Sequence, residues 1–301
     1  MTGAVTGRDA LSVGYIGLGT MGEPMASNVV RAGFPVTVFD VAAPPLERLA
    51  ALGADVARSA AELGRGCDVV LLNVVNDAQV KDVVLGASGA GGVLDSLTDG
   101  AVIVVHSTVH PSTCVQLAEV ARERGVGVVD APFTGGAAAA AAGTLSLLVG
   151  GDDTAVAAAG PVLAAEGTVH HLGTVGAGEL AKLGNNLVLG ITLAAVNEAL
   201  AMTAAAGLDR EVMLQVLTSG AADSWVARNW EAVGQMAQTY PRGAVGLAAL
   251  TYKDLDLGLR VAGDVRVDMP LTRLASGMLL EPYEAALRHL EDMTSQRRSR
   301  G

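Results

Sequence analysis

A chain of 301 residues is long enough for two domains, each with its own core. Half of the residues are apolar but only 3% are aromatic, so close-packed Ala, Val, Leu and Ile must build those cores. The net charge of −11 argues against nucleic acid or an anionic membrane as a partner. The C-terminal Arg297, Arg298 and Arg300 are interpreted as a frayed tail.

Neither end of the chain nor its cysteines indicate export. Residues 1–11 lack the apolar run of a signal peptide, and no stretch of about 18 uninterrupted apolar residues predicts a membrane anchor. Cys67 and Cys114 fit no metal-binding or CxxC spacing, so we expect buried, reduced thiols and no metal site. A cytoplasmic location follows as an expectation.

The first half of the chain alternates short apolar runs with helical stretches punctuated by glycine. The runs are SVGYI at 12–16, VTVFD at 36–40, DVVLLNV at 68–74, AVIVVHS at 101–107 and GVVDAP at 127–132. Continuous apolar runs are typical of parallel strands covered by helices on both faces. The pattern predicts an α/β fold, with a Rossmann-type doubly wound sheet in a dinucleotide-binding domain over residues 10–175.

Two further β-like segments, at 144–151 and 168–173, flank a helical stretch and are predicted to extend the sheet at its edge. Six consecutive alanines at 137–142 are interpreted as the start of a small-residue helix.

Strand signals cease after Gly178. Residues 179–206 predict one long helix that is apolar on every side, and such a helix should be buried between domains or between subunits. Beyond it, helical pieces are expected to break at Gly207, Gly220, Gly243, Gly263 and Pro270. An all-α second domain for substrate binding and oligomerisation is therefore predicted over residues 176–295.

A glycine-rich turn follows the first predicted strand. Its residues are Gly17, Leu18, Gly19, Thr20, Met21 and Gly22, a GxGxxG pattern that leads into a helix. Gly17 permits the tight turn, Gly19 lets backbone amides approach a pyrophosphate, and Gly22 allows close packing of helix on strand. Asp40 ends the second strand, where its carboxylate can accept from a ribose and would repel a 2′-phosphate. NAD is therefore favoured over NADP.

The long helix carries polar residues that its apolar sequence does not require. Lys182 and Asn186 stand four residues apart and share one helix face. Desolvation lowers the pKa of an ammonium, which suits a group that gives and takes a proton near neutrality. A structural interpretation is equally open at this point, with Lys182 reaching solvent and Asn186 bonding neighbouring backbone.

Four spaced motifs resemble those of the 3-hydroxyisobutyrate dehydrogenase family of β-hydroxyacid dehydrogenases. They are GLGTMGEPMASNVVRAG at 17–33, DAPFTGG at 130–136, GTVGAGELAKLGNN at 173–186 and YKDLDLGLRVA at 252–262. The resemblance covers about residues 12 to 275 and implies hydride transfer between NAD and the hydroxyl carbon of a small 3-hydroxy acid, giving a semialdehyde or ketone.

The resemblance also implies roles for individual residues. Lys182 would exchange the proton of the substrate oxygen, and Asn186 would help to position the substrate. Thr134, Gly135 and Gly136 would hold the carboxylate, and Lys253 would reach cofactor and substrate. Val74 and Thr108 would line the nicotinamide side.

The chain departs from the family pattern at three places. The motif that usually reads Val-Ser-Gly-Gly has Phe133 and Thr134, which leaves the size of the substrate open. His106 precedes Ser-Thr where another residue is common; a strand-end histidine is favoured over a second ionisable group near the nicotinamide. The usual Gly-rich C-terminal ending is missing.

Three other functions are alternatives to a hydroxy acid dehydrogenase. An imine reductase would share the fold, but those relatives generally prefer NADP and lack a lysine at the position of Lys182. A phosphogluconate-type dehydrogenase would need a larger helical domain and basic residues for a phosphate. A noncatalytic NAD-binding module would not need Lys182 and Asn186. The apolar helix further predicts a homodimer or homotetramer.

Overall fold

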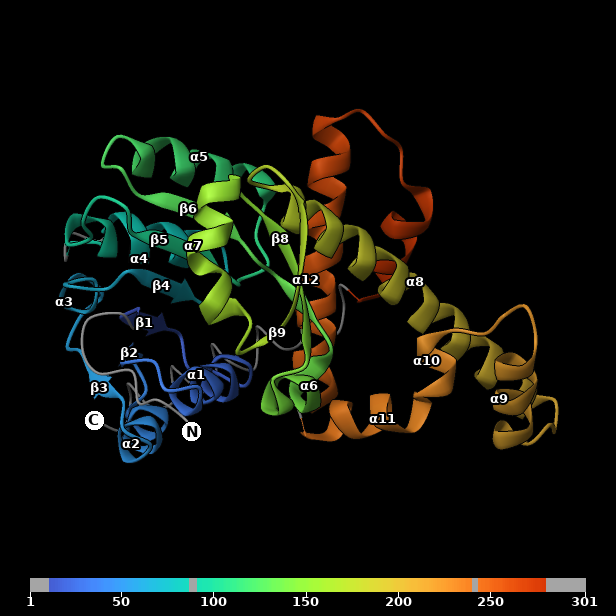
Figure 1. The fold of residues 1–301 in the computed structure, drawn as a ribbon. Coiled ribbons are helices and arrows are strands. Elements are labelled where there is room, and N and C mark those ends of the chain that lie inside the picture. The colour runs from blue at the N-terminus through green and yellow to red at the C-terminus, as the bar shows by residue number, and fades with distance from the viewer. Residues whose placement is uncertain (1–10, 87–90, 240–242, 280–301) are drawn as a thin grey trace, which may run out of the picture. The chain divides into compact units, whose positions relative to one another are not determined.

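The computed structural model describes residues 11–86, 91–239 and 243–279. The chain divides between Lys182 and Leu183 into two compact units (Figure 1). The three tail arginines and the divergent C-terminal sequence lie outside the described residues.

The first unit contains one sheet of nine strands, in the order β3-β2-β1-β4-β5-β6-β8-β7, with β9 paired to β8 (Figure 1). Strands β1 to β6 pair in parallel, which confirms the predicted doubly wound sheet. The strands are Val13–Ile16 (β1), Val36–Phe39 (β2), Asp55–Val56 (β3), Val69–Leu72 (β4), Val102–Val105 (β5), Gly127–Asp130 (β6), Phe133–Thr134 (β7), Leu145–Gly150 (β8) and Gly167–Gly173 (β9).

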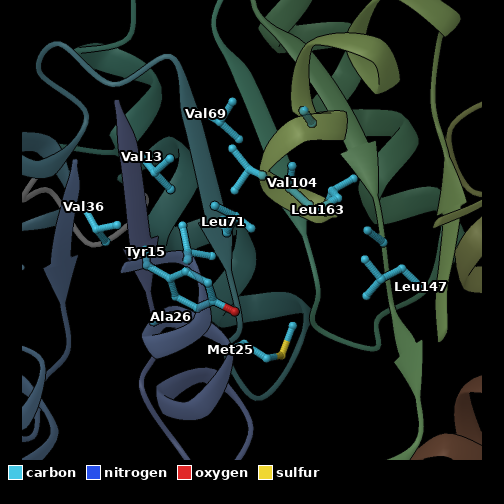
Figure 2. Packing of buried hydrophobic residues seen from close by; sticks show 14 of the residues in the cluster. Val13, Tyr15, Met25, Ala26, Val36, Val69, Leu71, Val104, Leu147 and Leu163 are labelled. Carbon is cyan, nitrogen blue, oxygen red and sulfur yellow. The ribbon is translucent and has the colours of Figure 1, made fainter. Parts of the chain in front are cut away.

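Alternate residues of the central strands face two separate cores. On β4, Val69 and Leu71 belong to one apolar cluster, and Val70 and Leu72 belong to the other. Figure 2 shows part of the first cluster, where the ring of Tyr15 packs among aliphatic side chains. Because apolar groups cover both faces, the central strands β4 and β5 are apolar at every position, as the continuous runs predicted.

Helices connect the strands of the first unit. They are Gly22–Arg31 (α1), Ala43–Ala51 (α2), Ala60–Leu63 (α3), Asp77–Leu85 (α4), the 3₁₀ turn Val93–Asp95 (η1), Pro111–Arg122 (α5), Gly136–Ala142 (α6) and Asp153–Leu163 (α7). Helix α6 confirms that the alanine run is a short helix, and it ends at Gly143 in the left-handed conformation.

The sequence did not predict two short strands, β3 and β7, which stand at the two ends of the strand order. Strands β8 and β9 confirm the two predicted edge segments. In addition, Phe133 and Thr134 form β7, which pairs antiparallel with Leu147 and Ser146 of β8. This pairing ties the DAPFTGG segment to the sheet.

The described part of the second unit is helical. Its helices are the later part of Ala177–Ala205 (α8), then Arg210–Ser219 (α9), Trp225–Arg228 (α10), Trp230–Thr239 (α11), Gly243–Asp264 (α12) and a helical stretch at 270–279. The predicted long helix is confirmed. The break predicted at Gly263 occurs one residue later, because α12 ends at Asp264 and the next helical stretch begins at 270. A small core joins Val196 and Leu200 of α8 to Leu217 and Val226.

Helix α8 is not buried on every side within this chain. Only 17% of its most apolar stretch is buried, and Val188 and Met202 are each 67% exposed. By length and hydropathy α8 could cross a membrane, but a core helix of a globular protein passes the same test. Burial between domains or between subunits therefore stays a prediction, because the chain alone leaves these side chains exposed.

Candidate active site

The glycines of the Gly17–Gly22 turn have different surroundings. Gly17 has a φ of +89°, and a Cβ there would lie 2.3 Å from the Asn73 carbonyl oxygen. A Cβ on Gly22 would lie 2.0 Å from the Gly17 carbonyl oxygen, so α1 starts directly against the turn. A Cβ on Gly19 would meet nothing within 4 Å. The turn thus has the geometry that a pyrophosphate needs: tight at both ends, open in the middle.

The other residues of the turn differ in exposure and in contacts. Leu18 is buried and Met21 packs partly against the first core, whereas Thr20 is exposed. The Leu18 N–H donates to Asp40 Oδ2 over 2.6 Å, and the Ala42 N–H donates to Asp40 Oδ1 over 2.8 Å. Asp40 therefore links the end of β2 to the glycine turn. An ionised carboxylate has further lone pairs, so it can still accept from a ribose hydroxyl.

Val74 follows β4, which pairs with β1, and Thr108 follows β5, which pairs with β4. The Val74 N–H donates to Ser107 Oγ over 2.8 Å, and a Cβ on Gly17 would lie 3.2 Å from a Val74 methyl. The carboxyl ends of β1, β4 and β5 therefore bring these residues to the glycine turn, where doubly wound sheets bind ligands. Sequence reasoning missed Ser107, although it adjoins Thr108.

Lys182 lies against the segment that was predicted to hold the substrate carboxylate. Its Nζ donates to the Phe133 carbonyl oxygen over 2.6 Å, and its side chain is half-buried. The next residues are Thr134, then Gly135 with φ +130° and Gly136 with φ +72°. A Cβ on Gly135 would lie 2.7 Å from the Ala139 Cβ, so the bend requires glycine. Lys182 and the candidate carboxylate donors are thus neighbours.

Asp130 connects the two elements that carry these groups. This buried residue ends β6, and its carboxylate accepts from the Gly176 N–H (2.6 Å) and the Glu179 N–H (2.9 Å) at the start of α8. Burial raises the pKa of Asp130, while the backbone N–H donors oppose that rise. The side chain fixes the first turn of α8, one turn before Lys182, to the strand that precedes Phe133.

In the second unit, Asn186 and Lys253 both contact the carboxylate of Asp254, one by a hydrogen bond and the other as an ion pair. Asn186 Nδ2 donates to Asp254 Oδ2 over 2.6 Å, and Lys253 Nζ lies 3.2 Å from Asp254 Oδ1. Asp254 is buried, so the two predicted site residues converge on a carboxylate that sequence reasoning missed. A signal was present in the sequence: Asp254 directly follows Lys253.

His106 is an ionisable core residue rather than a simple strand-end histidine. It follows β5, its side chain is fully buried, and its Nε2 lies 3.0 Å from Glu166 Oε2, which is equally buried. Its Nδ1 lies 2.7 Å from the Ala131 carbonyl oxygen, and Tyr15 OH donates to Glu166 Oε1 over 3.1 Å. Burial lowers the pKa of His106, but the Glu166 carboxylate and the Ala131 carbonyl outweigh burial, and the pKa is raised.

The Phe133 ring lies beside this pair. Its edge meets the His106 ring, with the ring centres 5.9 Å apart, and the side chain packs partly against the first core. Two of the positions at which the sequence departs from the family motifs, 106 and 133, therefore contact each other. The extra ring contacts the protein interior, so its size alone does not predict a smaller substrate.

Two family models together match most of the chain. The NAD binding domain of 6-phosphogluconate dehydrogenase matches residues 12–176. The NAD-binding domain of NADP-dependent 3-hydroxyisobutyrate dehydrogenase matches residues 176–298.

Named hydroxy acid dehydrogenases are similar to the chain in sequence and in structure over most of its length. 2-(Hydroxymethyl)glutarate dehydrogenase of Eubacterium barkeri is 33% identical and covers 95% of this chain and 96% of its own length. The crystal structure of 3-hydroxyisobutyrate dehydrogenase from Salmonella typhimurium has a TM-score of 0.80, with 32% identity over 91% of this chain and 95% of that one. The chain belongs to the 3-hydroxyisobutyrate dehydrogenase-like family of β-hydroxyacid dehydrogenases.

An imine reductase from Streptomyces aurantiacus is similar at a greater distance. It has a TM-score of 0.63 and 19% identity, over 91% of this chain and 95% of that chain. At this identity the likeness extends to the fold alone.

Substitutions of Gly22 and of Gly19 in the turn are predicted to affect stability and NADH binding separately. Gly22→Ala should destabilise the protein by about 1–3 kcal/mol, because the new methyl group meets a backbone oxygen that cannot move aside. Gly19→Ala should leave stability unchanged and weaken NADH binding, because its methyl group enters the open middle of the turn. Urea unfolding and NADH fluorescence titration measure the two effects. Equal stability of both variants would contradict the geometry.

The His106–Glu166 pair predicts a pH dependence of stability. Because its folded-state pKa is raised, the pair stabilises fully below the unfolded pKa of about 6.5, and that stability is lost as pH rises through the folded pKa. This one proton should lower the free energy of unfolding by about 1.4 kcal/mol per pH unit within that window. Urea unfolding of wild type and Glu166→Gln on both sides of neutrality provides the comparison. The idea fails if both proteins lose stability with the same slope.

Proposed function

We propose that this protein is an NAD-dependent oxidoreductase that oxidises the hydroxyl carbon of a small 3-hydroxy acid to a semialdehyde or ketone. One observation carries the proposal: the Lys182 ammonium lies 2.6 Å from the Phe133 carbonyl, directly before the Thr134–Gly135–Gly136 bend. A proton-transfer group thus adjoins donors suited to a carboxylate. Family membership supports the same reaction class.

Different residues of the chain would carry the proton transfer and the binding of the substrate carboxylate. Lys182 receives the proton of the substrate hydroxyl, and in the reverse direction its ammonium returns that proton to the carbonyl oxygen. A bound nicotinamide would supply the acceptor for the hydride of the hydroxyl-bearing carbon. The Thr134 hydroxyl and the N–H groups of Gly135 and Gly136 would hold the substrate carboxylate.

Residues from the second unit complete the proposed set. We propose that the Asn186 amide orients the substrate and that Lys253 contacts cofactor and substrate. Asp254 would fix both, because its two carboxylate oxygens engage one of them each. Asp254 is therefore a positioning residue in this scheme.

For the cofactor we propose NAD rather than NADP, on the charge of Asp40. The carboxylate stands at the end of β2, where it can accept from the adenosine ribose and would repel a 2′-phosphate. The following residue, Val41, is 98% exposed and offers no cation to such a phosphate. Thr20, Met21 and the turn glycines would contact the pyrophosphate, with Val74 and Thr108 on the nicotinamide side.

We also propose that the protein is a cytoplasmic homodimer or homotetramer. Free, buried Cys67 and Cys114 suit a reducing compartment, and burial raises the pKa of the Cys67 thiol to about 11. The exposed apolar side chains of α8 suit cover by a second copy of the chain.

The proposed function is tested by following NADH absorbance with a panel of 3-hydroxy acids: 3-hydroxyisobutyrate, 3-hydroxypropionate, glycerate and threonate. Reduction of NAD by at least one of them is expected. If no hydroxy acid reacts but cyclic imines are reduced, the imine reductase alternative is correct. If NADH binds and neither class reacts, a noncatalytic NAD-binding module is the better description.

Lys182→Ala should lower kcat by about 100- to 10,000-fold, the range lost when a general acid–base is removed, with NADH affinity unchanged. Lys81→Ala is the matched control, because Lys81 Nζ bonds Gln116 at the surface, and it should retain full activity. Steady-state kinetics and NADH titration give both quantities. A Lys182→Ala enzyme as fast as wild type would remove Lys182 from the chemistry.

Asp40→Asn should raise the ratio of NADP to NAD efficiency about tenfold, which corresponds to relief of roughly 1.4 kcal/mol of charge repulsion. The amide oxygen can still accept a backbone N–H in the turn, so the fold should persist. Comparing kcat/KM with the two cofactors gives the ratio. An unchanged ratio would show that Asp40 does not select the cofactor.

A further inference from the structure

Three buried polar side chains form a network behind the candidate site. Tyr15 from β1, His106 from the end of β5 and Glu166 from the loop before β9 are each at most 2% exposed. Tyr15 OH donates to Glu166 Oε1 (3.1 Å), and His106 Nε2 lies 3.0 Å from Glu166 Oε2. The proposed reaction uses none of the three directly.

The geometry requires a proton between His106 and Glu166. A carbonyl oxygen only accepts, so the 2.7 Å contact with Ala131 assigns a hydrogen to His106 Nδ1. If Nε2 carried only a lone pair, it would face a carboxylate oxygen at 3.0 Å, acceptor against acceptor. Nε2 and Oε2 lack a well-aligned hydrogen bond, so attraction between an imidazolium and a carboxylate best explains their approach. The pair is then neutral overall.

The network holds the segment that places Lys182. His106 bonds the Ala131 carbonyl, and its ring meets the edge of the Phe133 ring two residues later. The Phe133 carbonyl in turn accepts from Lys182 Nζ. Continuous contacts therefore lead from Glu166 through His106 to the proposed proton acceptor.

A core of this kind does not need a charged pair. Apolar side chains of similar volume would fill the space without removing two charges from water, and such replacements are often neutral or stabilising. A directed bond to Ala131, by contrast, fixes where the following strand β7 begins. Compared with an apolar replacement, the polar pair therefore supplies a fixed position rather than additional stability.

We propose that His106 is a positioning residue: held by Glu166 and Tyr15, it fixes residues 131–133 and thereby the place of the Lys182 ammonium beside Thr134–Gly136. The proposal rests on the proposed function for its kinetic consequences. Its structural content, the position of the Phe133 carbonyl relative to Lys182 Nζ, stands independently of any activity.

Three variants distinguish the effect of the hydrogen bond between His106 and Ala131 from the effects of charge and of packing. Glu166→Gln removes the charge, but its amide can accept from Tyr15 and donate to a neutral His106, so the bond to Ala131 persists. His106→Leu with Glu166→Gln removes the bond without leaving a lone buried charge. His106→Asn with Glu166→Gln restores a side-chain N–H at the position of Nδ1.

Steady-state kinetics with the reactive hydroxy acid, NADH titration and thermal melting are measured for all three. We expect Glu166→Gln to have a kcat near that of wild type. The Leu double variant should have a kcat about 100-fold lower, which is the effect of an ångström-scale misplacement of a reacting group. The Asn double variant should recover part of this loss in kcat. The affinity for NADH should be the same in all three variants as in wild type. A merely structural role would lower the melting temperature of the Leu double variant and leave kcat of the folded enzyme equal to that of Glu166→Gln, which would overturn the proposal.

Crystal structures of Glu166→Gln and of the Leu double variant supply the readout that is independent of activity. The Lys182–Phe133 contact should survive in the first and be lost in the second. If wild type oxidises no hydroxy acid, the proposed function fails by itself, and these two structures still decide the positioning role. An unchanged contact in the Leu double variant overturns it.

Discussion

The buried Asp130 carboxylate is the constraint on which the candidate site depends. It ends β6 and accepts the N–H groups of Gly176 and Glu179, so a strand of the sheet and the first turn of α8 are joined at one side chain. The chain beyond β6 then delivers the Phe133 carbonyl, and α8 delivers Lys182, to a common point. This anchor holds the helix turn that precedes Lys182 at the end of β6, the strand that leads to the Thr134–Gly136 bend.

Buried polar groups occur in each of the two units. His106, Glu166 and Tyr15 support the same segment from within the sheet, and in the second unit Asp254 gathers Asn186 and Lys253. Each arrangement removes charge from water, which is costly unless partners are well placed. Their concentration around proposed substrate and proton-transfer groups fits an enzyme that keeps its reacting groups fixed before substrate arrives.

The sequence predicted the parallel sheet, the glycine turn and α8, because continuous apolar runs and glycine spacing are local signals. It did not predict β7, since two residues of strand carry no periodicity. It also missed the pairing of His106 with Glu166 and of Asn186 with Asp254, because each joins residues far apart in the chain. The expected burial of α8 stays a prediction, because apolar composition indicates that a helix will be covered but does not identify the covering surface.

Hydride transfer from the hydroxyl-bearing carbon is the central claim. The direct measurement uses a 3-hydroxy acid with deuterium on that carbon, with NMR of the cofactor after turnover. Deuterium at C4 of the reduced nicotinamide, together with a slower rate than for the unlabelled acid, is the predicted result. Reduced cofactor without deuterium, or no reduction with any 3-hydroxy acid, would contradict it.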